Sequence, residues 1–139
     1  RSATATRRPP GATAADVGIA RELREAIFVL AGEARTASFD AAARAVLNRI
    51  AAEPPAAPML LANGDVALRG PVRSLLAALA QDAVRLFGAG GERIRQCESP
   101  TCSIFFVDAS RSGRRRWCSM AACGNKAKVS ALRARRSGA

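Results

Sequence analysis

Four cysteines are the residues of this chain best suited to chemistry. Cys97 and Cys102 form one pair and Cys118 and Cys123 a second, with four residues inside each pair and fifteen between the pairs. Two short pairs flanking a hairpin-length segment are how one chain assembles a tetrahedral four-thiolate zinc site. The spacing predicts a structural Zn²⁺ site. Two disulfides, which require an oxidising compartment, and free thiols are the alternatives.

The composition excludes several classes of enzyme. The chain has no histidine, which removes Ser-His-Asp triads, Cys-His proteases and three-His catalytic zinc sites. Four thiolates would also leave zinc without the open position that catalysis requires. The sequence contains no Walker loop and no G-x-G-x-x-G loop after a predicted strand. We therefore expect a protein that is not an enzyme.

Basic residues gather at the two ends of the chain. The net charge is +11, of which +7 lies in residues 97–139 and +3 in residues 1–8. This asymmetry is typical of a polyanion-binding module beside a near-neutral domain, although a solvated arginine-rich surface would look similar. We expect a phosphate clamp at residues 114–116. The candidate nucleic-acid contacts are Arg111, Arg114, Arg115, Arg116, Lys126, Lys128 and Arg133.

Apolar periodicity ahead of the cysteines predicts three helices. The first begins with Asp16 as N-cap, the second with Ser38 as cap, and the third near Pro71. Gly88 ends the third helix, and residues 88–91 are expected to form a hinge. Residues 1–13 lack periodicity and are interpreted as a disordered basic arm.

Two β-hairpins are also expected. Asn63-Gly64 stands between short apolar runs and predicts a type I′ turn, in which both central residues need a positive φ. Between the cysteine pairs, residues 103–107 should form a strand that turns and returns through residues 114–117. Trp117 is expected to pack over the zinc.

A final helix should follow the second cysteine pair. Ser119 is its candidate N-cap, and the helix should continue to about Arg136. An apolar arc should pack inward, and Asn125 should hydrogen-bond to backbone near the zinc. The arc consists of Ala121, Ala122, Val129 and Leu132.

Residues 95–136 resemble the CGNR zinc finger. The matching features are the first cysteine pair, an aromatic strand ending in Asp108, Ser110-Arg111, the run RRRWCSM at 114–120, and the tetrapeptide CGNK at 123–126. Lys126 stands where the family name has arginine, which retains the charge but not the bidentate fork. The helices at 16–88 resemble part of the family's mostly helical N-terminal domain, called ABATE. The resemblance implies a stress-induced, DNA-binding transcription regulator of bacterial type.

We therefore expect a mostly α fold, with a small helical domain carrying a β-hairpin followed by a four-cysteine zinc-binding ββα module. The expected boundaries are 1–13 for the arm, 14–90 for a partial ABATE-like domain and 91–139 for the finger. A zinc-stabilised adaptor for protein partners and an RNA-binding protein are the alternative functions. Expected partners are DNA and a second copy or another transcription component. No apolar run approaches the roughly 18–20 residues of a membrane span, so we expect a cytoplasmic protein.

Overall fold

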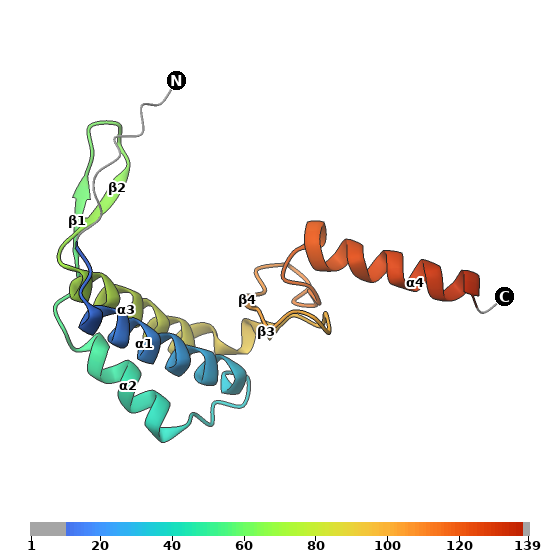
Figure 1. Ribbon diagram of the computed structural model, residues 1–139, viewed down its shortest axis with the longest axis horizontal. Helices are drawn as coiled ribbons and strands as arrows, with labels where there is room; N and C mark the ends of the chain where they lie inside the picture. The colour runs from blue at the N-terminus through green and yellow to red at the C-terminus, as the bar shows by residue number, and fades with distance from the viewer. Residues whose placement is uncertain (1–10, 138–139) are drawn as a thin grey trace.

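The computed structural model describes residues 11–137 and is mostly helical (Figure 1). Ten of the residues expected to form the basic arm, 1–10, lie outside this range. The described elements confirm a helical domain with a β-hairpin followed by a small cysteine module. In chain order they are α1 (Ala14–Glu33), α2 (Ala41–Ala51), β1 (Ala57–Leu60), β2 (Val66–Arg69), α3 (Val72–Gly90), a 3₁₀ turn (Gly91–Arg93), β3 (Ile94–Gln96), β4 (Phe105–Val107), a π-helical turn (Met120–Gly124) and α4 (Asn125–Ser137).

Helices α1, α2 and α3 form one hydrophobic core. Leu23 and Leu30 of α1 are almost fully buried against Leu47 and Ile50 of α2. The buried residues of α3 are all alanines, which lets its backbone approach the other two helices closely. Burying each Leu or Ile side chain contributes about 1.5–3 kcal/mol. The core therefore depends mainly on large residues from α1 and α2.

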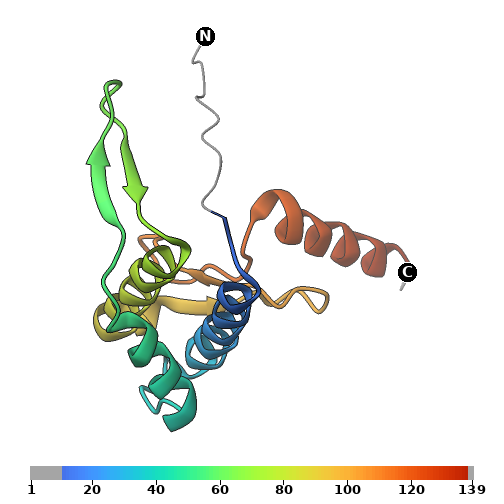
Figure 2. The same ribbon diagram turned by 60° about the vertical axis from the view of Figure 1, so that its left-hand side comes forward.

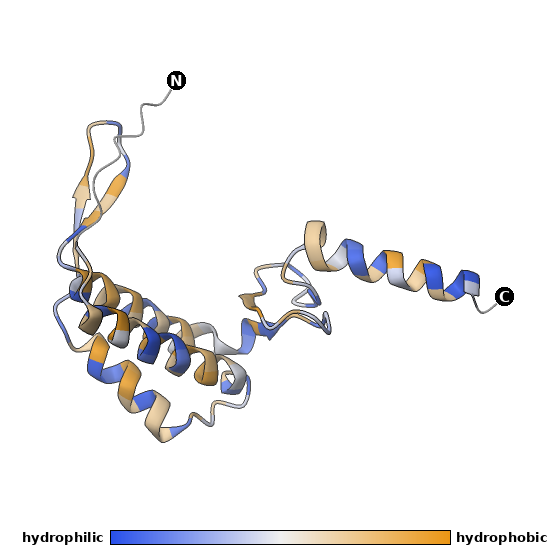
Figure 3. Cartoon of the chain, in the orientation of Figure 1, coloured by the Kyte–Doolittle hydropathy of each residue, from blue (hydrophilic) through white to orange (hydrophobic). Residues whose placement is uncertain are grey.

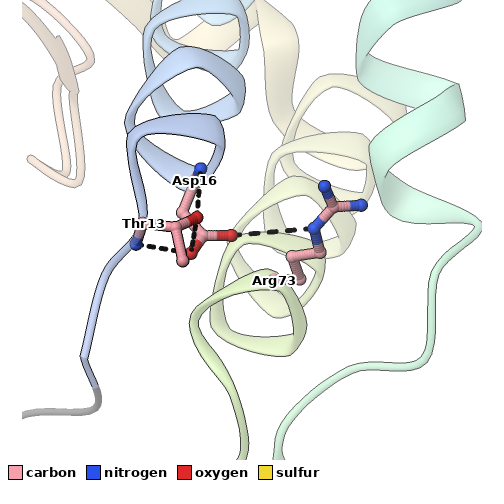
Figure 4. Close-up of polar contacts among 3 residues, drawn as sticks. All are labelled: Thr13, Asp16 and Arg73. Atoms are coloured by element: carbon pink, nitrogen blue, oxygen red, sulfur yellow. Dashed lines mark hydrogen bonds and ion pairs between the residues drawn. The ribbon is translucent and has the colours of Figure 1, made fainter.

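The caps of α1 and α2 differ from the sequence prediction. Thr13 is the N-cap of α1, and its hydroxyl and the Asp16 carboxylate complete a reciprocal capping box (Figure 4). Asp16 is thus the third helical residue, where its carboxylate also lies 3.6 Å from Arg73. Asp40 caps α2 by accepting from the N–H of Ala43 at 2.8 Å. The predictions of Asp16 and Ser38 as caps were wrong because other oxygens reach the free N–H groups.

The hairpin of β1 and β2 is confirmed, but its turn is not type I′. The N–H of Gly64 donates to the carbonyl of Leu61, and the N–H of Leu61 donates to the carbonyl of Asp65. Gly64 has φ +85° whereas Asn63 has no positive φ, which matches a three-residue loop with a glycine bulge. The side-chain oxygen of Asn63 holds this turn by accepting from the N–H of Asp65.

The β1–β2 hairpin extends away from the helical core (Figures 1 and 2). Its apolar side chains remain in solvent, Leu60 being 76% exposed.

Helix α3 continues past Gly88 to Gly90 and passes directly into the 3₁₀ turn. Pro71 is its N-cap and not its first helical residue. The helix therefore does not end at Gly88 as expected. Gly90 leaves the helical conformation, with φ −158° and ψ 17°, and the hinge expected at residues 88–91 stays a prediction.

Strand β4 pairs antiparallel with β3, with Ile94 opposite Val107 and Gln96 opposite Phe105. The expected return strand at residues 114–117 is wrong, because β3 already provides the ladder partner. The sheet packs on the end of α1, where buried Ile94 meets Ala31 and Ala34. Phe105 contacts Phe28 edge-to-face, with ring centroids 5.2 Å apart. These apolar contacts join the helical core and the cysteine module.

Helix α4 projects away from the rest of the chain (Figure 1). Ser119 caps the π-helical turn ahead of α4, as predicted for the start of the last helix, by accepting from the N–H of Ala122. No residue of α4 is buried, and Val129 and Leu132 are 47% and 51% exposed. The prediction that the apolar arc packs inward is wrong, because no other element of residues 11–137 covers these two side chains. Figure 3 shows that most of the helix is hydrophilic.

Within residues 11–137, no helix has the length and apolar character needed to cross a membrane.

Candidate metal centre

The four cysteine sulfurs gather in one cluster. All four Sγ atoms lie within 4.8 Å of one another. The Sγ of Cys118 lies 3.8 Å from that of Cys102 and 3.7 Å from that of Cys123. Tetrahedral ligands about 2.3 Å from zinc are about 3.8 Å apart, whereas disulfide sulfurs are about 2.05 Å apart. The cluster therefore has the donor set and spacing of a four-thiolate metal site.

Backbone hydrogen bonds position each sulfur. Cys97 follows β3, and its N–H donates to the carbonyl of Ile104 at 2.9 Å. Cys102 closes a tight turn by donating its N–H to the carbonyl of Ser99 at 3.0 Å. Cys118 precedes the cap of the last helix, and Cys123 lies in the π-helical turn. The sheet thus positions the first pair and the start of the last helix positions the second.

The cluster shifts the acidity of its own thiols. Burial acts to raise the pKa of Cys97, but the N–H groups of Cys118 and Ser99 outweigh it and lower that pKa to about 7. Burial and the neighbouring thiols raise the pKa of Cys118 to about 12. Four adjacent thiolates repel one another, so complete deprotonation requires a bound cation. A bound metal ion would therefore favour the fully ionised form of the site.

The turn that carries Cys123 is closely packed. A Cβ on Gly124 would lie 2.5 Å from Sδ of Met120 and 3.2 Å from Cδ1 of Trp117. Trp117 therefore packs against the metal-binding turn. Asn125 donates from Nδ2 to the carbonyl of Ala121 at 3.5 Å, which agrees with the structural role expected of it.

Asp108 holds the loop between the cysteine pairs. Its side chain is 1% exposed and accepts from the hydroxyl of Ser110 at 2.6 Å and from the N–H of Arg115 at 2.9 Å. These bonds lower the pKa of Asp108 below its ordinary value. The sequence indicated Asp108 only as the end of an aromatic strand. The Asp-x-Ser pattern, typical of a side chain that bonds to its own turn, was the available signal.

Arg115 and Arg116 make contacts inside the module. Arg115 donates to the carbonyls of Trp117 and Cys118, and its guanidinium lies 4.9 Å from the centre of the Phe106 ring. Arg116 pairs with Glu98 at 2.6 Å. Arg115 thus holds the backbone around the second cysteine pair, whereas Arg116 pairs with the side chain next to Cys97.

The other five candidate contacts are exposed. Among the described residues they have no side-chain hydrogen bond or ion pair. Lys126 and Arg133 border a groove of about 590 Å³ that runs along α4 and includes Trp117. Lys128 is also on α4, while Arg111 and Arg114 lie on the loop after β4. The full set of five is Arg111, Arg114, Lys126, Lys128 and Arg133.

Two family profiles match the chain. The CGNR zinc finger profile matches residues 93–136, which contain β3, β4, the four cysteines and nearly all of α4. The ABATE profile, described as "Putative stress-induced transcription regulator", matches residues 1–90. The chain belongs to the ABATE family. The two matches meet at the 3₁₀ turn that connects α3 to β3 in this ABATE protein. The chain has no match among curated proteins.

Proposed function

We propose that this ABATE-family protein is a DNA-binding transcription regulator whose four cysteines hold Zn²⁺. The single observation that carries the proposal is the convergence of the four sulfurs in a module that carries most of the chain's net charge. The family description as a transcription regulator supports the same role. The metal ligands in this proposal are Cys97, Cys102, Cys118 and Cys123.

The donor set supports zinc in a structural role. Four thiolates suit zinc and complete its tetrahedron, so no position remains for water or substrate. Bound zinc would supply the positive charge that keeps all four sulfurs deprotonated. The chain's own groups position the ligands, since the N–H of Cys118 and the guanidinium of Arg115 hold the second cysteine pair in place.

Helix α4 is the element best suited to meet DNA. It projects from the module with all its side chains at least partly in solvent, and it carries Lys126, Lys128 and Arg133. An isolated helix fits the major groove of B-DNA. Arg111 and Arg114 on the loop would add phosphate contacts. Arg115 bonds to backbone carbonyls and Arg116 pairs with Glu98, so neither is proposed as a primary phosphate contact.

The proposal assigns separate roles to three segments. Residues 91–139 would form the DNA-binding finger, and residues 14–90 would form the ABATE domain that dimerises or senses a signal. Residues 1–13 would add a basic arm. The protein is proposed to act in the cytoplasm, together with the DNA that it binds.

The test is the salt dependence of binding to a fluorescently labelled duplex, followed by anisotropy. Four or five phosphate contacts predict a slope of about −4 in a plot of log K against log salt concentration. Replacing Lys126, Lys128 and Arg133 by Ala should weaken binding and flatten the slope, because three positive charges are removed. Alanine has the highest helix propensity, so α4 should remain helical.

The control replaces Arg21, Arg44 and Arg69, three exposed arginines of the helical domain, by Ala. It changes the net charge equally and should leave the slope unchanged. Binding that does not respond to salt, or equal losses in both triple variants, would contradict the proposal.

A further inference from the structure

A hollow of about 590 Å³ lies where the helical domain meets the cysteine module. One wall comes from the end of α1 and the turn after it, with Gly32 and Arg35. Further lining comes from β3 and from the loop that carries Arg114. Its volume is within the range of sites that bind small molecules. Neither family description assigns a ligand to it.

Five arginines line this junction hollow against one carboxylate. They are Arg35, Arg95, Arg114, Arg115 and Arg116, of which Arg115 has its guanidinium committed to Phe106 and to the carbonyls of Trp117 and Cys118. The carboxylate is that of Glu98, and it pairs with Arg116 at 2.6 Å. Among residues 11–137, none of the other four arginines lies within ion-pair distance of a carboxylate. The junction hollow therefore carries positive charge that the chain does not neutralise.

Arg95 adds an observation of a different kind. Its Nη2 donates to the carbonyl of Gly113 at 2.7 Å, which fixes the guanidinium in place. Its Nε is buried and has no hydrogen-bond partner. A buried donor without an acceptor costs free energy. Because this atom is closed to solvent, an anion in the hollow would satisfy it once the Arg95 side chain rotates toward that anion. Asp108 attracts Arg95 electrostatically, but its carboxylate already accepts hydrogen bonds from Ser110 and Arg115.

The same hollow has an apolar floor. Buried Ile94, half-buried Phe105 and Ala31 line it beside the arginines. Guanidinium groups recognise phosphate through paired N–H donors, and apolar surface recognises a hydrocarbon or a flat ring. We propose that the junction hollow binds a small phosphorylated molecule with a short apolar or planar body.

The position of Arg35 favours a small ligand over nucleic acid. Arg35 follows α1 and Arg114 lies on the loop after β4, and both line the hollow. A molecule small enough to enter a hollow of about 590 Å³ can meet both, whereas a DNA duplex cannot enter it. This inference is independent of DNA binding by α4, because the residues of α4 do not line the junction hollow.

Calorimetric titration of the zinc-loaded full chain with phenyl phosphate tests the proposal, with inorganic phosphate compared at the same ionic strength. We expect one saturable site and tighter binding of phenyl phosphate. Arg35→Ala and Arg114→Ala should each weaken it about fivefold or more, because each removes a charged hydrogen bond. Both side chains are exposed and form no ion pair among residues 11–137, so the fold should persist.

Arg44→Ala is the matched control, since Arg44 is an exposed arginine of α2 that does not line the junction hollow. It should bind phenyl phosphate as the unaltered chain does. Absence of a saturable site, or equal loss in Arg44→Ala, would overturn the proposal. The variants are also titrated with labelled duplex DNA. If Arg35→Ala weakens DNA binding while phenyl phosphate fails to bind, the hollow is a nucleic-acid surface and the proposal is wrong.

Discussion

The backbone N–H of Cys118 donates a hydrogen bond to the Sγ of Cys97 at 3.5 Å. This contact joins the two cysteine pairs directly and helps to lower the pKa of Cys97 to about 7. Each pair therefore depends on the other for its position. A metal bound by all four sulfurs would fix that arrangement and supply folding free energy to a module with few large apolar residues.

The chain's single tryptophan provides a readout of this coupling. Trp117 adjoins Cys118 and contacts the turn that carries Cys123. A zinc chelator should shift its fluorescence emission to longer wavelength as the module loosens, and added zinc should reverse the shift. The far-ultraviolet circular dichroism should keep most of its helical signal, since α1–α3 share a core cluster of their own. Trp117 fluorescence that does not change when the chelator is added would contradict a structural role for the metal in this module.

Gly124 should be intolerant of even one added methyl group. In Gly124→Ala, the new Cβ would meet Met120 and Trp117, so we expect faster zinc release to a chromogenic chelator. Adding Met120→Ala should restore part of the retention, because it removes the contact at 2.5 Å. Gly88→Ala is the control, since its Cβ would enter open space in α3 and should stabilise by about 0.5–1 kcal/mol. Unchanged zinc release in Gly124→Ala would refute the packing argument.

Arg114 and Arg115 are neighbours in the sequence but should have different roles. Arg115→Ala removes the donors to the carbonyls of Trp117 and Cys118, so zinc release should become faster. Arg114→Ala removes an exposed side chain without such contacts, so zinc release should be unchanged while the affinity for labelled duplex DNA falls. The measurements are the chelator assay and anisotropy on the same preparations. Equal behaviour of the two variants in both assays would contradict this division.

Asp16 should make the helical domain sensitive to acid. Its hydrogen bonds with Thr13, and secondarily Arg73, lower its pKa below 3.8, the ordinary value. A carboxylate with a depressed pKa in the folded state contributes stability above its unfolded pKa, and that stability is lost as pH falls through the folded pKa. Asp16→Asn should therefore lower the melting temperature at pH 7, and the difference should shrink as pH falls below 3.8.

Asp82→Asn is the control for this experiment, because Asp82 is an exposed carboxylate of α3 that pairs only with Arg85. Melting followed by circular dichroism should show little change in that variant. A loss in Asp16→Asn that stays constant from neutral to acid pH would show that the ionised carboxylate is not the cause.

The sequence predicted those features that depend on local spacing. The apolar residues of α1 and α2 recur at helical spacing and form the core, and Ser119 caps the last helix. The cysteine pairs indicated the sulfur cluster because chain spacing limits where thiolates can meet. The predicted helix starts were less accurate, since an aspartate such as Asp16 can be either the N-cap or the third helical residue.

Features that depend on distant partners were not predictable in this way. Strand β3 has three residues, too few for an alternating pattern, and its pairing with β4 is set by packing of Ile94 on α1. An apolar arc on α4 indicates a face but not whether anything covers it. Arg115 contacts the module because Asp108 and Phe106 fix the position of its loop. The distribution of charge along the sequence does not reveal that position.

The most direct test of the central claim is duplex DNA binding by the same preparation before zinc removal, after it, and after zinc is restored. Anisotropy at one stated salt concentration should show binding that is lost with the metal and recovered with it, because zinc would hold the module that presents Lys126, Lys128 and Arg133. Equal affinity in the metal-free chain, with the removal of zinc confirmed by metal analysis, would contradict the account.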